Sequence, residues 1–240
     1  MRIIGVIPAR YKSTRFEGKP LADICGKPMI WWTYNQVKKV KGLDDVYIAT
    51  EDERILNKCQ QLNMNAILTK DTHTMMLERI QEVSTKINAD LYISIAGDEP
   101  LIEPETIEKV IKEFKKEYND VVNLRTPIKN PIDVVNWTTM KVVTNADGYA
   151  LYASRNPIPY PKASLNYTYY KHMRTYGLTK KALDFFVDHN KGPLETVEDF
   201  DLLRFLEYGM KVKIIDVESS TISVDTQKDL DRVREIIKNY

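Results

Sequence analysis

The chain has 240 residues, enough for one large α/β domain or for a core domain with a sizeable insertion. Its 35 Lys and Arg residues balance 34 Asp and Glu residues, which argues against a dedicated nucleic-acid binder with a basic excess. Cys25 and Cys59 lack metal-ligand spacing, and no run of 18 apolar residues predicts a membrane span. Since no secretory signal is visible, we expect a cytoplasmic protein.

Strand-like and helical patterns alternate through the first half of the chain. Short apolar runs predict strands at 3–7, 46–49, 66–68 and 91–96, and helical spacing predicts helices at 29–39, 53–62, 77–87 and 105–117. Pro104 suits the first turn of the last of these helices. This alternation indicates βαβ units, and therefore an α/β fold with a mostly parallel twisted sheet flanked by helices.

The pattern changes near residue 123. From about 123 to 175 the chain is rich in Pro, Asn and Tyr, with short β-like runs at 140–144 and 149–153. We interpret this stretch as a smaller, more antiparallel subdomain inserted into a single domain of residues 1–240. Helical spacing returns at 180–188 and 198–208, and a strand at 212–217 and a final helix at 227–238 follow.

A basic loop follows the first predicted strand. Arg10, Lys12, Arg15 and Lys19 place four cations within ten residues, beyond the end of a strand where ligands of open parallel sheets bind. A triphosphate needs fixed cations and backbone N–H groups, so the loop is a candidate phosphate cradle. A solvated basic loop is the alternative. The segment is neither a Walker A motif nor a Gly-x-Gly-x-x-Gly fingerprint.

The basic loop and several later blocks resemble one known enzyme family. The loop reads Ile-Pro-Ala-Arg-Tyr-x-Ser-Thr-Arg-x-x-Gly-Lys-Pro-Leu, and Gly-Lys-Pro-Met-Ile follows at 26–30. Further blocks occur in family order at 97–100 (Gly-Asp-Glu-Pro), 141–159, 171–177, 193–195, 203–204 and 224–226 (Val-Asp-Thr). Over essentially its whole length the chain resembles CMP-Kdo synthetase, the 3-deoxy-manno-octulosonate cytidylyltransferase family. The resemblance implies a Rossmann-like nucleotidyltransferase fold and Mg²⁺-dependent transfer of CMP from CTP, with release of pyrophosphate.

The resemblance also implies the nucleotide site. Its residues would be Pro8, Ala9, Arg10, Arg15, Lys19, Arg79, Gly97 and Asp98. Arg10, Arg15 and Lys19 would neutralise the triphosphate and, with Asp98 and Asp225, form the catalytic set. In the family the two aspartates are the metal ligands, and carboxylates at strand ends suit Mg²⁺.

For the acceptor we expect a small anion. Its site residues would be Arg155, Lys171, His172, Tyr176 and Glu195, from blocks that resemble the family, together with Arg174, which departs from the family pattern. Two assignments keep an alternative, because His172 also suits a satisfied buried imidazole and Arg79 also suits an exposed helix start. The family commonly forms homodimers through the inserted subdomain, and the Tyr-rich stretch 160–170 suits such a contact.

Four departures from the family pattern fall near the base and the acceptor. Ala96 stands for Gln, Met75-Met76-Leu77 for Ser-Gly-Thr, Asp201-Leu202 for Glu-Gln, and Lys171-His172-Met173-Arg174 for Arg-His-Leu-Gly. Lost polar groups alter the binding of a hydroxylated sugar acid, whereas Arg174 adds positive charge. We therefore predict a remodelled acceptor site for a phosphorylated metabolite such as phosphoglutamine, giving a CDP-linked product. A true CMP-Kdo synthetase with tolerated substitutions is the alternative.

The expected function is thus a cytidylyltransferase of bacterial capsule or lipopolysaccharide biosynthesis, with no nucleic-acid or membrane partner. A non-catalytic nucleotide-binding regulator is the rival of a different class. Retention of both aspartates with the basic loop argues against it. A uridylyl- or guanylyltransferase is a second rival, because the altered residues 75–77 belong to the region that faces the base.

Overall fold

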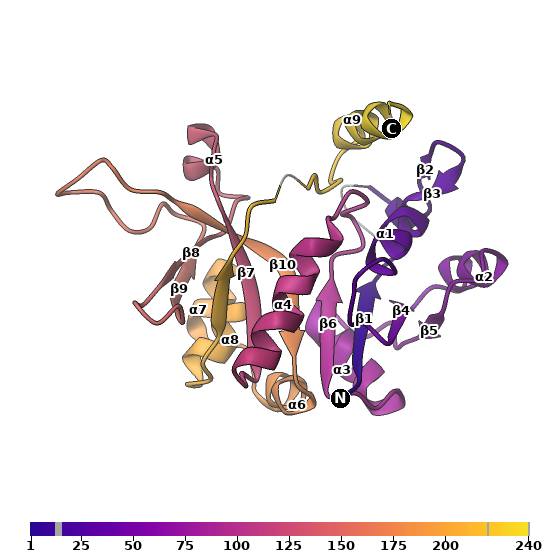
Figure 1. The fold of residues 1–240 in the computed structure, drawn as a ribbon, viewed down its shortest axis with the longest axis horizontal. Helices are drawn as coiled ribbons and strands as arrows, with labels where there is room; N and C mark the ends of the chain where they lie inside the picture. Colours follow the sequence, from indigo (N-terminus) through magenta and orange to yellow (C-terminus); the bar gives the residue numbers. More distant parts are fainter. Residues whose placement is uncertain (13–15, 220, 240) are drawn as a thin grey trace.

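The computed structural model describes residues 1–12, 16–219 and 221–239, and a mixed β-sheet forms its centre (Figure 1). Seven strands lie in the order β11 (Lys213–Asp216), β7 (Val121–Pro127), β10 (Tyr170–Leu178), β6 (Leu91–Ile95), β1 (Ile3–Pro8), β4 (Asp45–Thr50) and β5 (Ala66–Leu68). β10 is antiparallel to β6 and β7, whereas the other neighbouring pairs in this order are parallel. The predicted α/β fold with a mostly parallel sheet is confirmed.

Helices cover both faces of the sheet because its central strands are apolar on both sides. Ile3 and Ile7 of β1 contribute to one hydrophobic cluster, and Ile4 and Val6 to the other. The first cluster takes in α1 (Met29–Val37), α2 (Glu53–Gln61) and α4 (Pro104–Lys116). The second takes in α3 (Met76–Lys86), α6 (Lys180–Asp188) and α8 (Leu202–Glu207). As predicted, α4 begins at Pro104.

Residues 123–175 extend the sheet at one end. They contain most of β7 and β10, the short helix α5 (Pro131–Val135), and the hairpin of β8 (Lys141–Thr144) and β9 (Ala150–Ser154). β8 pairs with β10, so the hairpin belongs to the main sheet. Figure 1 shows α5, the hairpin and the connection to β10 projecting at the left of the molecule. A distinct subdomain here stays a prediction.

One predicted helix is broken in the structure. The expected helix at 198–208 is instead the end of α7 (Pro193–Glu198) followed by α8, because Asp199 between them has a left-handed backbone with φ 49°. Asp adopts this conformation more readily than most residues, and a left-handed residue ends an α-helix. The apolar spacing continues across the break, so it gave no sign of the interruption.

The C-terminal helix α9 (Gln227–Lys238) forms where it was predicted, and it fixes the segment that precedes it. Its N-terminus is a capping box of Thr226 and Asp229. α9 packs on α1 and the small ribbon of β2 (Asp23–Ile24) and β3 (Lys27–Pro28) through Ile24, Met29, Val224, Leu230 and Val233. Among the helices of residues 1–12, 16–219 and 221–239, none has the length and apolarity needed to cross a membrane.

Candidate active site

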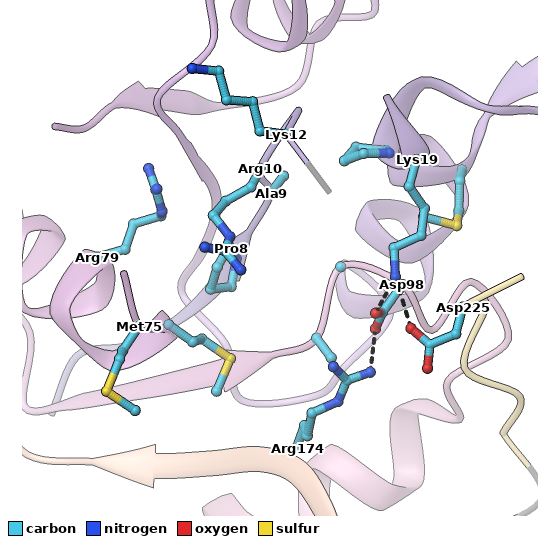
Figure 2. Close-up of a pocket in the computed structure, with 15 residues that line it drawn as sticks. Pro8, Ala9, Arg10, Lys12, Lys19, Met75, Arg79, Asp98, Arg174 and Asp225 are labelled. Atoms are coloured by element: carbon cyan, nitrogen blue, oxygen red, sulfur yellow. Dashed lines mark hydrogen bonds and ion pairs between the residues drawn. The ribbon is translucent and has the colours of Figure 1, made fainter. Parts of the chain in front are cut away.

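A cleft of about 370 Å³ lies where β1 and β6 end, and it contains most of the predicted nucleotide residues (Figure 2). Pro8 and Ala9 continue from β1, and Gly97 and Asp98 follow β6. A Cβ atom on Gly97 would lie 2.8 Å from the carbonyl oxygen of Pro8, so only glycine lets the two strand ends approach this closely. The described lining is Pro8, Ala9, Arg10, Lys12, Lys19, Pro20, Met29, Met75, Met76, Arg79, Ala96, Gly97, Asp98, Arg174 and Asp225.

Lys19 joins the two predicted metal ligands. Its Nζ lies 2.6 Å from Asp98 Oδ2 and 3.3 Å from Asp225 Oδ1 (Figure 2). Lys19 opens a short 3₁₀ helix (Lys19–Leu21) after Gly18, whose φ of 68° favours glycine. Asp225 directly precedes the N-cap of α9, so the packing of that helix holds it over the cleft.

Asp98 has a cation on each carboxylate oxygen. Arg174 Nη2 lies 2.9 Å from Oδ1, opposite Lys19 on Oδ2. Burial would raise the pKa of Asp98, but attraction by Arg174 and Lys19 outweighs it and lowers the pKa to about 2. Asp98 is therefore an anion at any physiological pH, as a metal-binding carboxylate must be. At the neighbouring Glu99 burial is the stronger effect, and it raises the pKa of that carboxyl group to about 7.

Arg79 and Arg10 line the cleft on the side away from Lys19 (Figure 2). Arg79 is 1% exposed, which contradicts the alternative of an exposed helix-start arginine. Its guanidinium forms a 3.0 Å ion pair with Glu51, and burial lowers its pKa. Arg10 donates a 3.3 Å hydrogen bond to the carbonyl of Thr74. Arg15, the remaining predicted cation, lies outside the described residues.

A second cavity of about 410 Å³ adjoins the cleft. The two share Met75, Met76 and Arg174 among their described lining residues. The remaining lining residues of the second cavity are Thr74, His172, Tyr176, Lys191, Asp199, Phe200 and Asp201. Three predicted acceptor residues, His172, Arg174 and Tyr176, are thus brought together beside the nucleotide cleft.

A hydrogen-bonded chain forms part of the wall of this second cavity. Tyr176 Oη donates to Asp201 Oδ1 at 3.0 Å and lies 2.9 Å from His172 Nε2. Burial raises the pKa of Asp201 to about 6, although the hydrogen bond from Tyr176 lowers it. Burial, aided by Arg174, lowers the pKa of His172 to about 3, so its imidazole is neutral at pH 7. His172 is thus both a hydrogen-bonded imidazole and part of the cavity wall.

Three predicted acceptor residues are not brought to either cavity. Glu195 is 0% exposed, and both its oxygens lie 2.7 Å from the guanidinium of Arg204, so its carboxylate is used inside the protein. Arg155 donates to the carbonyl of Glu198 at 2.7 Å. Lys171 is part of β10, and neither it nor Arg155 belongs to the described lining of the two cavities.

Other contributors to the site gave weak signals in the sequence. Lys191, Phe200 and Thr74 line the second cavity, and Glu51 holds Arg79 from the end of β4. Phe200 reaches the cavity because the chain breaks between α7 and α8, and this break was not predicted. Glu51 follows a predicted strand, and that position was the signal that could have identified it.

The comparisons with known proteins agree with this geometry. A model of the cytidylyltransferase family matches residues 4–214. The chain belongs to the cytidylyltransferase family. It is 42% identical to the 3-deoxy-manno-octulosonate cytidylyltransferase of Fusobacterium nucleatum, over 99% of this chain and 98% of that protein. The mitochondrial 3-deoxy-manno-octulosonate cytidylyltransferase of Arabidopsis thaliana is 36% identical over 99% of this chain and 83% of its own length.

Solved structures support the same assignment. The structure of CMP:2-keto-3-deoxy-manno-octonic acid synthetase complexed with CTP superposes with a TM-score of 0.95 and 34% identity, covering 100% of this chain and 99% of that one. A glucose-1-phosphate thymidylyltransferase of Bacillus anthracis shares the fold at a TM-score of 0.69, with 15% identity over 99% of this chain and 96% of that chain. This cytidylyltransferase is accordingly an enzyme, a nucleotidyltransferase.

Proposed function

We propose that this cytidylyltransferase transfers CMP from CTP to a sugar acid of the 3-deoxy-manno-octulosonate type and releases pyrophosphate, in lipopolysaccharide biosynthesis. One observation carries the proposal: the cleft with Lys19, Asp98 and Asp225 adjoins a second cavity lined by His172 and Tyr176. Transfer requires a nucleotide and an acceptor to lie side by side. The full-length identity to relatives that carry this name supports the same acceptor.

The two aspartates fit a magnesium ion that is shared with the nucleotide. Among the described residues no group of three or more His, Cys, Asp or Glu side chains is arranged to hold a metal. Asp98 and Asp225 instead approach one Lys19 ammonium, and Mg²⁺ prefers one or two carboxylates together with phosphate oxygens. When bound, the ion would supply positive charge to the phosphates at the reacting centre.

The residues of the chain supply the remaining positioning and charge. Lys19 and Arg10 would neutralise phosphate oxygens as negative charge moves onto the leaving pyrophosphate. Arg79, fixed by Glu51, would contact the nucleotide at the other side of the cleft. In the second cavity, Asp201, held by the hydroxyl of the buried Tyr176, presents a carboxylate that can hydrogen-bond to sugar hydroxyls.

A phosphorylated acceptor is the second candidate, and Arg174 is the observation that favours it. Its guanidinium lines both cavities and adds a cation where the acceptor would lie. A small phosphorylated metabolite such as phosphoglutamine would then give a CDP-linked product.

We also propose that two copies of the chain associate through the segment 123–175. Its exposed apolar side chains include Ile132, Val135, Trp137 and Leu151, which are 61% to 71% exposed. α5 and the β8–β9 hairpin, which carry Ile132, Val135 and Leu151, project from the molecule (Figure 1), and exposed apolar side chains mark interaction surfaces. Light scattering would show twice the mass of the chain, and Trp137→Glu would reduce the mass to that of one chain.

Pyrophosphate release with CTP, Mg²⁺ and a panel of acceptors tests the proposed function. We expect turnover with 3-deoxy-manno-octulosonate that greatly exceeds turnover with phosphorylated amino acids or sugar phosphates. Higher turnover with a phosphorylated acceptor would favour the second candidate. Replacement of CTP by UTP, GTP or ATP should abolish release, and comparable release with any of them would contradict the choice of nucleotide.

A further inference from the structure

We propose that Arg174 is a tethered cation that competes with the divalent metal for Asp98 and leaves Asp98 when an anion binds in the second cavity. The inference rests on the proposed metal site and concerns the order in which the metal and the acceptor anion bind. It gives Arg174 a role as a positioning residue that links metal loading to acceptor binding.

A β-bulge aims Arg174 at Asp98. Met173 of β10 lies opposite Leu124 of β7, but Tyr176 lies opposite Asn123, so Arg174 and Thr175 are extra residues on this edge of the strand. Bulges redirect side chains, and they occur often beside active sites. On its other edge β10 pairs with β6, with Thr175 opposite Ile95, which places Arg174 beside the strand end that carries Asp98.

The buried amide of Asn123 holds the bulge in shape. Its Nδ2 donates to the carbonyls of Met173 and Thr175, at 2.9 Å and 2.8 Å. These carbonyls flank Arg174, so a side chain from β7 bridges the extra residues. Asn123 is 0% exposed, and the two bonds are therefore shielded from water.

Arg174 pairs with the carboxylate oxygen of Asp98 that Lys19 does not contact. Its Nη2 lies 2.9 Å from Asp98 Oδ1 and 2.8 Å from Ser223 Oγ. Asp98, Glu99 and Asp225 are the acidic groups whose charges act on the guanidinium. Because both oxygens of Asp98 carry a cation, a metal ion that takes either oxygen must displace or share an existing contact.

The second cavity offers the guanidinium another place. Arg174 lines it, and the side chain is 44% exposed. Arg174 and Lys191 are the cationic side chains among its described lining residues, since His172 is neutral at pH 7. A carboxylate or phosphate group placed there would draw Arg174 from Asp98 and free Oδ1.

Calorimetric titration of Mn²⁺ into the nucleotide-free enzyme tests this inference. We expect Arg174→Gln to bind Mn²⁺ about fivefold more tightly than the wild type, as removal of one partly exposed ion pair predicts. Arg2→Gln, which removes a half-exposed ion pair with Asp45 and is not among the described lining of either cavity, is the matched control and should bind as the wild type does. Equal affinity of Arg174→Gln and the wild type would overturn the inference.

Sulfate at constant ionic strength tests the link to the second cavity. Sulfate should tighten Mn²⁺ binding by the wild type and have no such effect on Arg174→Gln. An equal effect on both would refute the link, because it would then arise from Lys19 or Arg10. Asp98→Asn separates the proposed metal site from the proposed role of Arg174. Unchanged Mn²⁺ binding by Asp98→Asn would refute the metal site itself. Lost binding by Asp98→Asn, together with unchanged binding by Arg174→Gln, would refute only the role of Arg174.

Discussion

The backbone N–H of Val224 donates a 2.8 Å hydrogen bond to the carbonyl of Asp98. This bond joins the loop after β6 to the segment that enters α9. As a result, the side chains of Asp98 and Asp225 approach the same Lys19 ammonium, at 2.6 Å and 3.3 Å. Two carboxylates distant in the chain are thus placed as a pair by main-chain geometry, which explains why α9 and its packing matter for the site.

Asp98→Asn and Asp225→Asn should each lower turnover about 10²- to 10³-fold or more, because each removes a charge that the proposed metal site requires. Pyrophosphate release measures the loss, and circular dichroism should show an intact fold. Asp231→Asn, which removes an exposed carboxylate on α9, is the control and should retain activity. Near-normal turnover in either site variant would contradict the metal assignment.

Glu195→Ala should destabilise the protein by about 3–5 kcal/mol, because it leaves the guanidinium of Arg204 buried without its partner. Urea denaturation measures this change. The KM for the acceptor should stay the same, since Glu195 is buried away from both cavities. The double variant Glu195→Ala with Arg204→Met should recover part of the stability. A raised acceptor KM with normal stability would instead support the prediction that Glu195 binds the acceptor.

Asn123→Ala should cost about 1–3 kcal/mol of stability, because the carbonyls of Met173 and Thr175 lose their shared donor. It should also raise the acceptor KM and tighten Mn²⁺ binding in the same direction as Arg174→Gln, since the bulge that aims Arg174 is released. Thermal unfolding and calorimetry measure the two effects. Destabilisation with unchanged KM and Mn²⁺ affinity would show that Asn123 serves the fold alone.

Asp201 should make stability depend on pH. Its pKa is about 6 in the folded protein, against an ordinary value of 3.8, so between these values the folded protein binds more protons than the unfolded chain. Its contribution is therefore complete below about pH 4 and is lost as the pH rises through 6, by about 3 kcal/mol. Asp201→Asn should flatten this decline in urea denaturation. Tyr176→Phe should enlarge it, because the hydrogen bond from Tyr176 lowers the pKa of Asp201. An unchanged decline in Asp201→Asn would contradict the assignment.

The nucleotide half of the site was predictable because it depends on strand ends. Apolar runs located β1 and β6, and ligands of such sheets bind where these strands end, which placed the basic loop and Asp98 at one edge of the sheet. The roles of Lys19 and Asp98 came from the resemblance of their sequence blocks to the family. Asp225 was found through the Val-Asp-Thr block, since its position depends on the packing of α9.

The acceptor half was less predictable because it depends on contacts across the sheet. β10 lies inside the sheet, between β7 and β6, yet the polar residues at its start resemble a loop. The bulge that orients Arg174 is a matter of register with β7, which a single sequence does not encode locally. Glu195 lay in a matching family block, and only its pairing with Arg204 shows that it is part of the core.

The most direct test of the proposed transfer uses CTP labelled at the α-phosphate, with Mg²⁺ and 3-deoxy-manno-octulosonate. We expect the label to appear in a sugar-linked CMP product, with unlabelled pyrophosphate released in equal amount, and both to vanish with EDTA or in Asp98→Asn. Label that stays in CTP with this acceptor, but passes to a phosphorylated one, would contradict the proposed acceptor. Label that passes to no acceptor in the panel would contradict the proposed transfer itself.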